Sequence, residues 1–346
     1  MLKGMGDFFA LDIGTNAIRV VQLRKSGSGW SLDHYGYAPI DSKLTSSDSE
    51  ESRRKVAEVI MTAVGQSGIR SKNVVIGLPS SKTFTTVVDV PNTNESELKA
   101  TMKYQIDQYI PMAVDEAKVD WALLGPSLRA QNQQEVLLSS VAREYSEARL
   151  ELVESLGLNV IAAEPDPIAM VRALTTPGQP GAVVQLDMGE HSTDIAITYG
   201  DTPRLVRTIP TGLASFVKAT VANLNVQEDQ ARQFILKFGL APDRLEGQVL
   251  RALEVSLDSF AAEISKSIKF FETRYPSVAI QAVLIAGFAS AVPQLDAYLA
   301  SKTGKPVHIA NPWQGIQLSQ EDQRQLGAVA TEFVTAIGLA KRGGTL

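Results

Sequence analysis

The chain has 346 residues, of which 44% are hydrophobic and 21% are charged, so it is long enough for about two domains with ordinary cores. A net charge of −5 argues against nucleic acid as the main partner, and the absence of cysteine excludes disulfides, thiolate catalysis and cysteine-ligated metals. No apolar run approaches the ~20 residues that span a bilayer, and the N-terminal segment lacks the form of a secretory signal, so we expect a cytoplasmic protein.

The first predicted elements are two strands joined by a short turn. A strand at residues 8–11 runs into Asp12, and a second β-rich run follows at residues 17–23. Gly14 and Asn16 tolerate positive φ, so the turn between the strands is expected to be a tight hairpin. The backbone N–H groups of such a turn form an anion-binding nest, and an acid beside it repels the anion unless a cation lies between them. We therefore predict Mg²⁺ and a nucleotide phosphate, with plain turn chemistry as the alternative.

The rest of the first half predicts a subdomain inserted into the first lobe. Its elements are a Ser-rich loop at 41–54, helices at 55–65, 94–110 and 146–157, and strands at 73–78, 84–90, 119–124, 135–141 and 158–163. The helix at 94–110 begins at Asn94, which can form a capping box with Glu97, and Pro111 ends it. The succession strand–strand–helix–strand–strand–helix is compact enough to form a separate subdomain.

Two carboxylates open the next predicted helix, at residues 168–174. Glu164 and Asp166 precede it within the run Glu-Pro-Asp-Pro, where acidic residues suit the helix dipole. The functional alternative is that one of them orients an attacking water or accepts a proton in phosphoryl transfer. The Gly- and Pro-rich segment 175–181 that follows is the best candidate for a domain boundary.

The second half starts with a second copy of the acidic hairpin. Leu186-Asp187-Met188-Gly189 repeats the Leu-Asp-Ile-Gly of the first copy, and each copy is followed by a turn and two further strands. Such a duplication favours two similar domains that face each other across one phosphate chain. The remaining predicted elements are strands at 182–186, 194–199, 204–210, 282–285 and 306–309 and helices at 213–223, 227–237, 250–275, 293–303 and 327–341.

With both hairpins in view, the chain resembles the actin-like ATPase superfamily, which includes actin, DnaK-type chaperones, sugar kinases, FtsA and MreB. Within it the chain is most similar to the PilM family of type IV pilus assembly. Three segments carry this resemblance: 97–125, with its Tyr-Ile-Pro and Asp-Trp; 185–197, the second phosphate loop; and 261–276, a Glu-Ile-x-x-Ser helix. The resemblance implies an α/β fold of the actin-like (ribonuclease H-like) type, with two lobes and the inserted subdomain of FtsA and PilM.

The resemblance also implies ATP bound with Mg²⁺ between the lobes. The implied nucleotide-binding residues are Asp12, Gly14, Thr15, Asn16, Asp187, Gly189, Ser192, Thr193, Gly212, Lys266, Gly287 and Phe288; Asp12 and Asp187 would hold the metal through water, and Glu164 and Asp166 are the candidate catalytic acids. The adenosine turn departs from the family's Gly-Gly-Gly, because it reads Ala286-Gly287-Phe288. Arg232 and Ile235 replace the Glu and Lys of an Ala-Glu-x-x-Lys helix. Base specificity is therefore open, and we expect a slow ATPase at most.

The partner implied by the resemblance is the cytoplasmic tail of PilN, a membrane protein. Its docking groove would lie beside the inserted subdomain, near Leu78, Pro79, Tyr109, Ile110 and Pro111. Pilus motor ATPases and further copies of the chain, in an oligomer or ring, are the other implied partners. The protein would then be a cytoplasmic scaffold that is peripheral at the inner face of the membrane.

The predicted domain division follows the two lobes. It comprises 1–72, first lobe; 73–161, inserted subdomain; 162–180, return to the first lobe and interdomain helix; 181–214, second-lobe core; 215–281, helical nucleoside-side subdomain; 282–327, second-lobe core; and 328–346, a C-terminal helix that packs back on the first lobe. Two alternatives use the same fold. A small-molecule kinase requires a catalytic carboxylate in a second pocket, and an FtsA-like cell-division filament protein requires a membrane-binding helix after the last predicted one.

Overall fold

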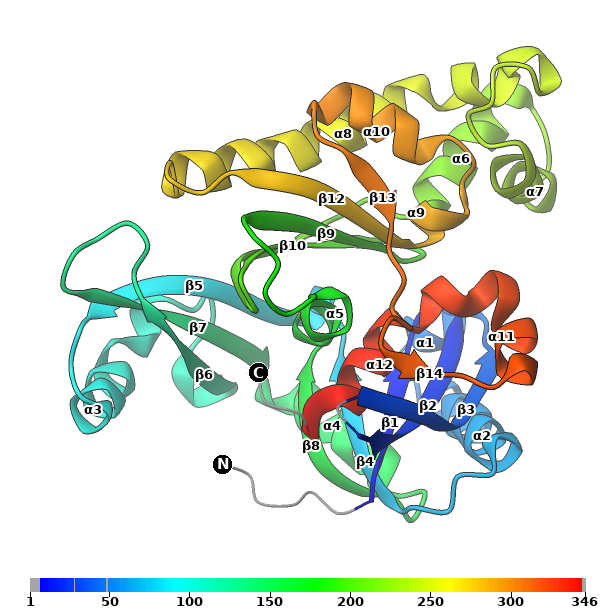
Figure 1. Ribbon diagram of the computed structural model, residues 1–346. Coiled ribbons are helices and arrows are strands. Elements are labelled where there is room, and N and C mark those ends of the chain that lie inside the picture. The colour runs from blue at the N-terminus through cyan, green and yellow to red at the C-terminus, as the bar shows by residue number, and fades with distance from the viewer. Residues whose placement is uncertain (1–6, 28, 48, 344–346) are drawn as a thin grey trace.

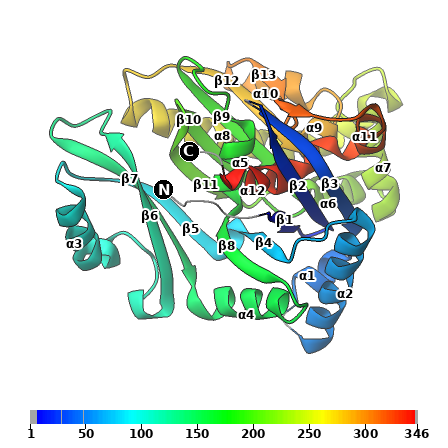
Figure 2. The same ribbon diagram turned by 60° about the horizontal axis from the view of Figure 1, so that its bottom comes forward.

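The computed structural model describes residues 7–27, 29–47 and 49–343, and it contains three β-sheets (Figure 1). Two large sheets form the cores of two lobes, and a smaller sheet projects to one side of both (Figure 2). Among the described helices, none is long and apolar enough to cross a membrane.

The first lobe is built on a six-stranded sheet in the order β14-β3-β2-β1-β4-β8. Its strands are β1 (Phe9–Ile13), β2 (Ala17–Ser26), β3 (Gly29–Pro39), β4 (Asn73–Leu78), β8 (Asn159–Pro165) and β14 (Ile316–Gln317). On one face, the apolar side chains of β1 and β2 pack against α2 (Glu50–Ser67) and α4 (Arg143–Glu154). Because strand side chains alternate between faces, Asp12 and Arg19 point to the opposite face, toward the second lobe.

The second lobe repeats this topology, which confirms the predicted duplication of the strand units. Its sheet has the order β11-β10-β9-β12-β13, formed by β9 (Ala182–Met188), β10 (Thr193–Tyr199), β11 (Thr202–Ile209), β12 (Ile280–Gly287) and β13 (Val307–Ile309). In both lobes the first strand pairs antiparallel with the second and parallel with the fourth. The outer face is covered by α6 (Leu213–Leu224), α7 (Glu228–Phe238), α8 (Gln248–Arg274) and α10 (Leu295–Thr303).

Two helices occupy the space between the lobes. α5 (Asp166–Leu174) and α12 (Val334–Ala340) pack against each other in a core that takes Ala10 from the first sheet and Ala196 from the second. They approach so closely that a Cβ on Gly338 would lie 1.8 Å from the carbonyl oxygen of Ala169. α12 is therefore the element by which the C-terminal region returns to the first lobe.

The third sheet has the order β5-β7-β6 and belongs to the inserted unit. It consists of β5 (Thr83–Pro91), β6 (Ala117–Pro126) and β7 (Gln133–Ala142), and α3 (Glu95–Gln105) covers one face. The predicted bounds of 73 and 161 also include β4 and β8, which pair with each other in the first-lobe sheet. Those two bounds are therefore too wide. The strands that form a sheet of their own run from β5 to β7.

Several predicted elements differ from the structure. The predicted loop at 41–54 contains α1 (Ser42–Thr45) and the start of α2, because the Ser49 hydroxyl accepts from the Ser52 amide and caps α2 early. The predicted helix at 327–341 begins as a 3-10 helix, Gly327–Phe333, and becomes α-helical only in α12. α11 (Gln320–Leu326) and β14 were not predicted. Residues 344–346, beyond the predicted last helix, lie outside the described residues.

Candidate functional site

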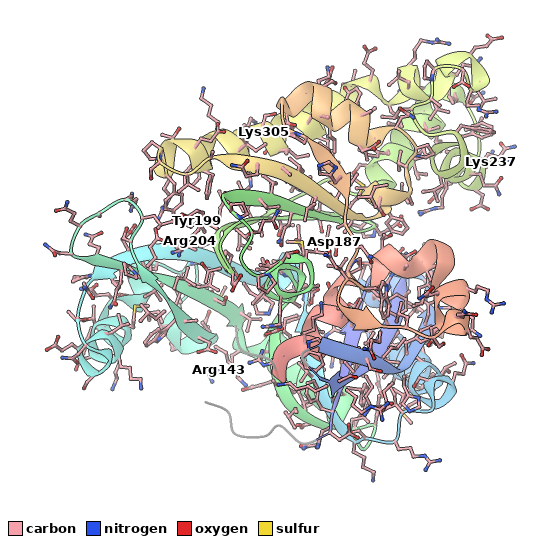
Figure 3. The ribbon with its side chains drawn as sticks, in the orientation of Figure 1. Arg143, Asp187, Tyr199, Arg204, Lys237 and Lys305 are labelled. Atoms are coloured by element: carbon pink, nitrogen blue, oxygen red, sulfur yellow. The ribbon has the colours of Figure 1, made fainter. Side chains whose placement is uncertain are left out.

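The two acidic hairpins face each other across one cleft between the lobes. Together with the solvent at its mouth, the cleft has an empty volume of about 800 Å³. From the first lobe it is lined by the β1–β2 turn with Asp12 and by Arg19, and from the second by the β9–β10 turn with Asp187. Figure 3 shows Asp187 at the end of the second sheet that faces the first lobe. The lining also includes Gly14, Thr15, Asn16, Asp166, Gly189, Ser192, Asp194, Gly287, Phe288 and Glu332.

The first turn is held in place by residues outside it that donate hydrogen bonds to its backbone carbonyls. The carbonyl of Asn16 accepts from the Ile40 amide at 2.9 Å, and the carbonyl of Thr15 accepts from the Thr45 hydroxyl at 2.8 Å. The turn is tight, as predicted, with Ile13 opposite Ile18, but neither Gly14 nor Asn16 uses the positive φ that it tolerates. Gly14 is required by space instead: a Cβ there would lie 2.8 Å from a guanidinium nitrogen of Arg19.

The second turn is fixed by the start of α6. The Gly189 amide donates to the Ser192 carbonyl at 2.8 Å, and the first amides of α6 donate to the carbonyls of Gly189 and Glu190. Gly212 precedes α6 and lies so close that a Cβ would be 2.5 Å from the Glu190 carbonyl oxygen. Thr193 is buried, and its hydroxyl donates to the Thr211 carbonyl. Gly212 and Thr193 thus shape the turn without lining the cleft.

Four aspartates gather in the cleft. Burial, and then the neighbouring Asp194, raise the pKa of Asp187 to about 7. Burial raises the pKa of Asp194 to about 6, although Thr208 donates a hydrogen bond to it. Burial also raises the pKa of Asp12, against the attraction of Arg19, and raises that of Asp166 well above its ordinary range. The site is therefore short of positive charge when these groups are ionised.

Arg19 and Asp194 are site residues that the sequence predictions omit. Arg19 is buried, with a guanidinium nitrogen 3.5 Å from the Asp12 carboxylate and a second ion pair to Glu332. Asp194 lies directly opposite Asp187 in the β9–β10 register. Strand alternation was the available signal, since it places both side chains on the interlobe face of their strands.

Two other predicted site residues lie away from the cleft. Glu164 is buried in ion pairs with Arg172, at 3.0 Å from one guanidinium nitrogen, and with Arg342. Its carboxylate therefore faces the groove beside the inserted subdomain, and of the two candidate acids only Asp166 reaches the cleft. Lys266 lies on an exposed part of α8 and pairs with Glu263. Neither Glu164 nor Lys266 is among the residues that line the cleft.

The nucleoside side of the cleft carries an ion pair. Arg232 of α7 donates to both carboxylate oxygens of Glu190, which lines the cleft. Ile235, one turn further along α7, is fully buried in the second-lobe core. Phe288 begins α9 (Phe288–Ala291) and lines the cleft from the end of β12. A Cβ on Gly287, whose φ is +61°, would lie 2.4 Å from the Asp187 carboxylate, so only glycine lets β12 end there.

The expected partner residues divide between three places. Leu78 lines a hollow between β8 and the inserted sheet, with an empty volume of about 510 Å³, and Pro79 lines the interlobe cleft. Tyr109 and Ile110 pack in the core of the inserted subdomain, whereas Pro111 is exposed. A larger groove of about 930 Å³ adjoins the hollow and is lined by Asp120, Trp121, Glu164, Pro165, Ile168 and Arg172, among others.

The cleft residues fit a magnesium ion held with a phosphate chain. Their donors are carboxylate oxygens, which Mg²⁺ prefers, and one carboxylate oxygen of Asp166 is buried without a hydrogen-bond partner. Among the described residues, no group of three or more His, Cys, Asp or Glu side chains is placed to hold a metal ion. An ion here would therefore keep several waters and take ligands from phosphate oxygens, as Mg²⁺ does in nucleotide sites.

The comparisons with known proteins agree with this arrangement. The family model of the type IV pilus assembly protein PilM matches residues 10–344. A chain of the PilM–PilN type IV pilus biogenesis complex is similar with a TM-score of 0.83 and 22% identity, over 99% of this chain and 100% of that one.

Two further solved structures have the same fold. The ethanolamine utilization protein EutJ from Carboxydothermus hydrogenoformans has a TM-score of 0.54 and 15% identity, over 96% of this chain and 88% of that one. MreB 5 of Spiroplasma citri bound to AMPPNP has a TM-score of 0.50 and 11% identity, over 99% of this chain and 100% of that one. The predicted actin-like fold class is thereby confirmed.

Proposed function

The chain belongs to the PilM family of type IV pilus assembly proteins, and from this premise we propose that it is an ATP- and Mg²⁺-binding scaffold that docks the cytoplasmic tail of a PilN-like membrane protein. It would thereby lie at the inner face of the cell membrane and link its membrane partner to the pilus motor. The observation that carries the nucleotide part is the pair of opposed acidic turns that line one cleft.

Both turns would contribute groups that bind a triphosphate. Their backbone N–H groups offer anion-binding positions on both sides of the cleft. Arg19 supplies a buried cation on the first-lobe side, and Asp12 and Asp187 are the residues that would hold the metal ion, through its waters. When bound, Mg²⁺ would neutralise phosphate oxygens and shield them from these carboxylates.

The same electrostatics favour binding over turnover. Of the two candidate catalytic acids only Asp166 lines the cleft, and burial and the neighbouring Asp12 hold its pKa well above the ordinary range. A raised pKa favours the protonated form of a carboxyl group, and that form cannot accept a proton as a general base. This supports a protein that hydrolyses ATP slowly at most. The Arg232–Glu190 ion pair occupies the nucleoside side, which supports weak discrimination among bases.

The groove between the inserted subdomain and the first lobe is the proposed docking site for the partner tail. β6 is an edge strand of its sheet, so an extended peptide can pair with it. Trp121 of this strand lines the groove, with Ile168 of the first lobe opposite. The similarity to a chain of the PilM–PilN complex supports this choice of partner.

Calorimetric titration with Mg-ATP tests the nucleotide site. We expect Asp12→Ala and Asp187→Ala to abolish binding, while Asp243→Ala, at an exposed surface position, retains the affinity of the parent chain. Circular dichroism would verify that each variant is folded. Equal ATP affinity in all four proteins would show that the turns are structural only.

A peptide titration tests the partner separately. With a synthetic PilN cytoplasmic tail as the probe, we expect Trp121→Ala to weaken binding at least ~10-fold, the usual cost of truncating a buried aromatic anchor. Val255→Ala, which changes an exposed apolar residue on α8, is the matched control. Equal affinities would place the tail elsewhere, and no binding by the parent chain would refute the proposed partner.

A further inference from the structure

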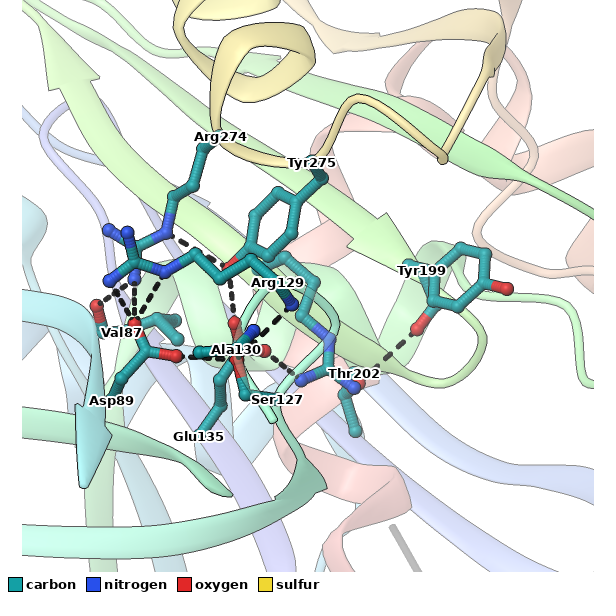
Figure 4. A network of polar contacts seen from close by, with 11 residues as sticks. Val87, Asp89, Ser127, Arg129, Ala130, Glu135, Tyr199, Thr202, Arg274 and Tyr275 are labelled. Atoms are coloured by element: carbon teal, nitrogen blue, oxygen red, sulfur yellow. Dashed lines mark hydrogen bonds and ion pairs between the residues drawn. The ribbon is translucent and has the colours of Figure 1, made fainter. Parts of the chain in front are cut away.

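The inserted subdomain is joined to the second lobe by a buried charge network (Figure 4). At its centre is Glu135 of β7, whose side chain is fully buried. Its carboxylate forms an ion pair with Arg204 of β11 and accepts a hydrogen bond of 2.8 Å from the Tyr275 hydroxyl at the end of α8. Figure 3 shows Arg204 where the second lobe meets the inserted sheet. Breaking such a pair leaves an uncompensated buried charge, which costs about 3–5 kcal/mol.

A second layer surrounds this pair. Asp89 of β5 accepts hydrogen bonds from Arg129, at 2.7 Å, within the insert and from Arg274, at 3.1 Å, on α8 of the second lobe. Arg274 also donates to the Val87 carbonyl at 3.1 Å. Leu128, in the β6–β7 connection, packs against the apolar core of the second lobe. The joint to the second lobe is therefore ion-paired, and its centre at Glu135 and Arg204 is buried from water.

The joint between the insert and the first lobe is of a different kind. Lys118 and Glu147 form an ion pair at 3.3 Å in which the side chains are 39% and 52% exposed, a class of pair that contributes at most about 1 kcal/mol. The exposed Arg143 donates to the carbonyl of Ala117 at 3.1 Å. Beside these contacts lie the groove of about 930 Å³ and the hollow of about 510 Å³. The contacts between the insert and the first lobe are therefore exposed to solvent and loosely packed. They change more easily than the buried contacts between the insert and the second lobe.

One of the two chain connections between the first lobe and the insert, the one from β4 to β5, passes through the interlobe cleft. Pro79, Ser80 and Ser81 connect β4 to β5, and all three line the cleft. The Ser80 side chain is close enough to lower the pKa of Asp194, which lines the same cleft from the second lobe. A ligand that draws the lobes together therefore acts directly on the segment about which the insert would turn.

We propose that the Glu135–Arg204 network makes the inserted subdomain move with the second lobe, so that closing the interlobe cleft changes the width of the groove between the insert and the first lobe. This inference rests on the proposed function of both sites, and it names how one regulates the other. Binding in the cleft and binding in the groove are then coupled, and each ligand changes the affinity of the other by the same factor, typically ~5–150-fold for such coupling. The network residues are positioning residues and contact neither ligand.

Distance measurements between spin labels test the proposal directly, since the chain has no native cysteine. Suitable exposed positions are Met61 on α2, Tyr104 on α3 and Val255 on α8, which are 44%, 79% and 84% exposed. Each would be replaced by cysteine in pairs, as Met61→Cys with Tyr104→Cys and as Val255→Cys with Tyr104→Cys. Addition of Mg-AMPPNP should shift the mean 61–104 distance and leave the 104–255 distance unchanged.

Variants that lack the Glu135–Arg204 network test whether the network causes the distance changes expected for the parent chain. Glu135→Leu with Arg204→Met removes both buried charges together, which spares the fold the cost of an unpaired charge. We expect a broader 104–255 distance distribution and no nucleotide-dependent shift at 61–104. Arg274→Met is the milder second variant, and Arg129→Met is its matched control, because Arg129 binds the same Asp89 carboxylate from within the insert.

Calorimetry on the same labelled samples separates the two ideas. If Mg-AMPPNP binds while the 104–255 distance changes, or while neither distance changes, the inference is overturned and the nucleotide site stands. If the network variants keep the nucleotide-dependent shift at 61–104, the inference is likewise overturned. If Mg-AMPPNP does not bind the parent chain, the proposed function is refuted, and the coupling that depends on it falls as well.

Discussion

Replacing Asp187 by asparagine should make the protein without ligand more stable at alkaline pH. In the folded protein, burial and the neighbouring Asp194 raise the pKa of Asp187 from 3.8 to about 7. At about 1.36 kcal/mol per pKa unit, this corresponds to about 4 kcal/mol of unfavourable free energy for the ionised form in the fold. Asp187 keeps some contact with solvent in the cleft, so we halve this figure and expect about 2 kcal/mol for Asp187→Asn.

The sign and the pH window follow from proton linkage. Because the pKa of Asp187 is higher in the folded state, the folded state binds more protons between pH 3.8 and about 7. The free energy of unfolding therefore falls as pH rises through this window, and the loss is complete above it. Asp187→Asn removes this dependence, so the variant and the parent chain should be equally stable near pH 4 and differ most near pH 8.

Urea denaturation at several pH values measures this difference, with Asp243→Asn as an exposed control that should change nothing. A nucleotide with Mg²⁺ should reverse the order, because a ligand at 100 times its Kd stabilises the parent chain by about 2.7 kcal/mol and the variant has lost the site. If Asp187→Asn is as stable as the parent at pH 8, or less so, burial in the cleft does not destabilise the ionised Asp187 and the reasoning fails.

Three further substitutions test other parts of the structure. Arg19→Met removes the cation beside Asp12 and should cost about 3–5 kcal/mol in urea denaturation and abolish Mg-ATP binding; retained affinity would exclude Arg19 from the site. Glu164→Gln leaves its two arginine partners unpaired, so it should lower the free energy of unfolding by about 3 kcal/mol. The ATP affinity measured by calorimetry should stay constant, and a loss of affinity would mean that Glu164 takes part in nucleotide binding. Gly338→Ala should lower the unfolding temperature by the equivalent of about 3 kcal/mol, because its Cβ would overlap the Ala169 carbonyl, and an unchanged temperature would mean that α12 is free to shift.

The duplicated lobes were predictable because their signals are local. Each hairpin couples an alternating apolar strand to a short acidic turn, and strand alternation then decides the face on which Asp12 and Asp187 lie. The parallel pairing of β4 with β8 is not local, since the whole inserted sheet lies between the two strands in sequence. This is why the predicted bounds of the inserted subdomain include both strands.

Glu164 and Asp166 show where local reasoning ends. Both precede one helix and both suit its dipole, so spacing alone does not distinguish them. The distinction comes from Arg342, which is 178 residues away along the chain and binds Glu164 on the far side of α5. Among the described residues Asp166 has no such partner, and one of its oxygens is buried without a hydrogen bond beside the cleft. Only tertiary contacts could assign the two acids.

The unfavourable burial of ionised carboxylates in the cleft and the charge network at the insert have complementary effects on lobe motion. Ionised carboxylates at the interlobe face oppose closure, and a cation that enters with a phosphate chain removes this opposition. When a cation removes the unfavourable free energy of the ionised Asp187, that gain would favour movement of the second lobe toward the first. Breaking the Glu135–Arg204 pair would cost about 3–5 kcal/mol, which is more than the about 2 kcal/mol available at Asp187. The easier response is therefore for the insert to follow the second lobe and for the groove at the first lobe to change shape. Nucleotide binding would thus change the shape of the partner groove, because the insert is held more strongly by its buried contacts to the second lobe than by its exposed contacts to the first lobe.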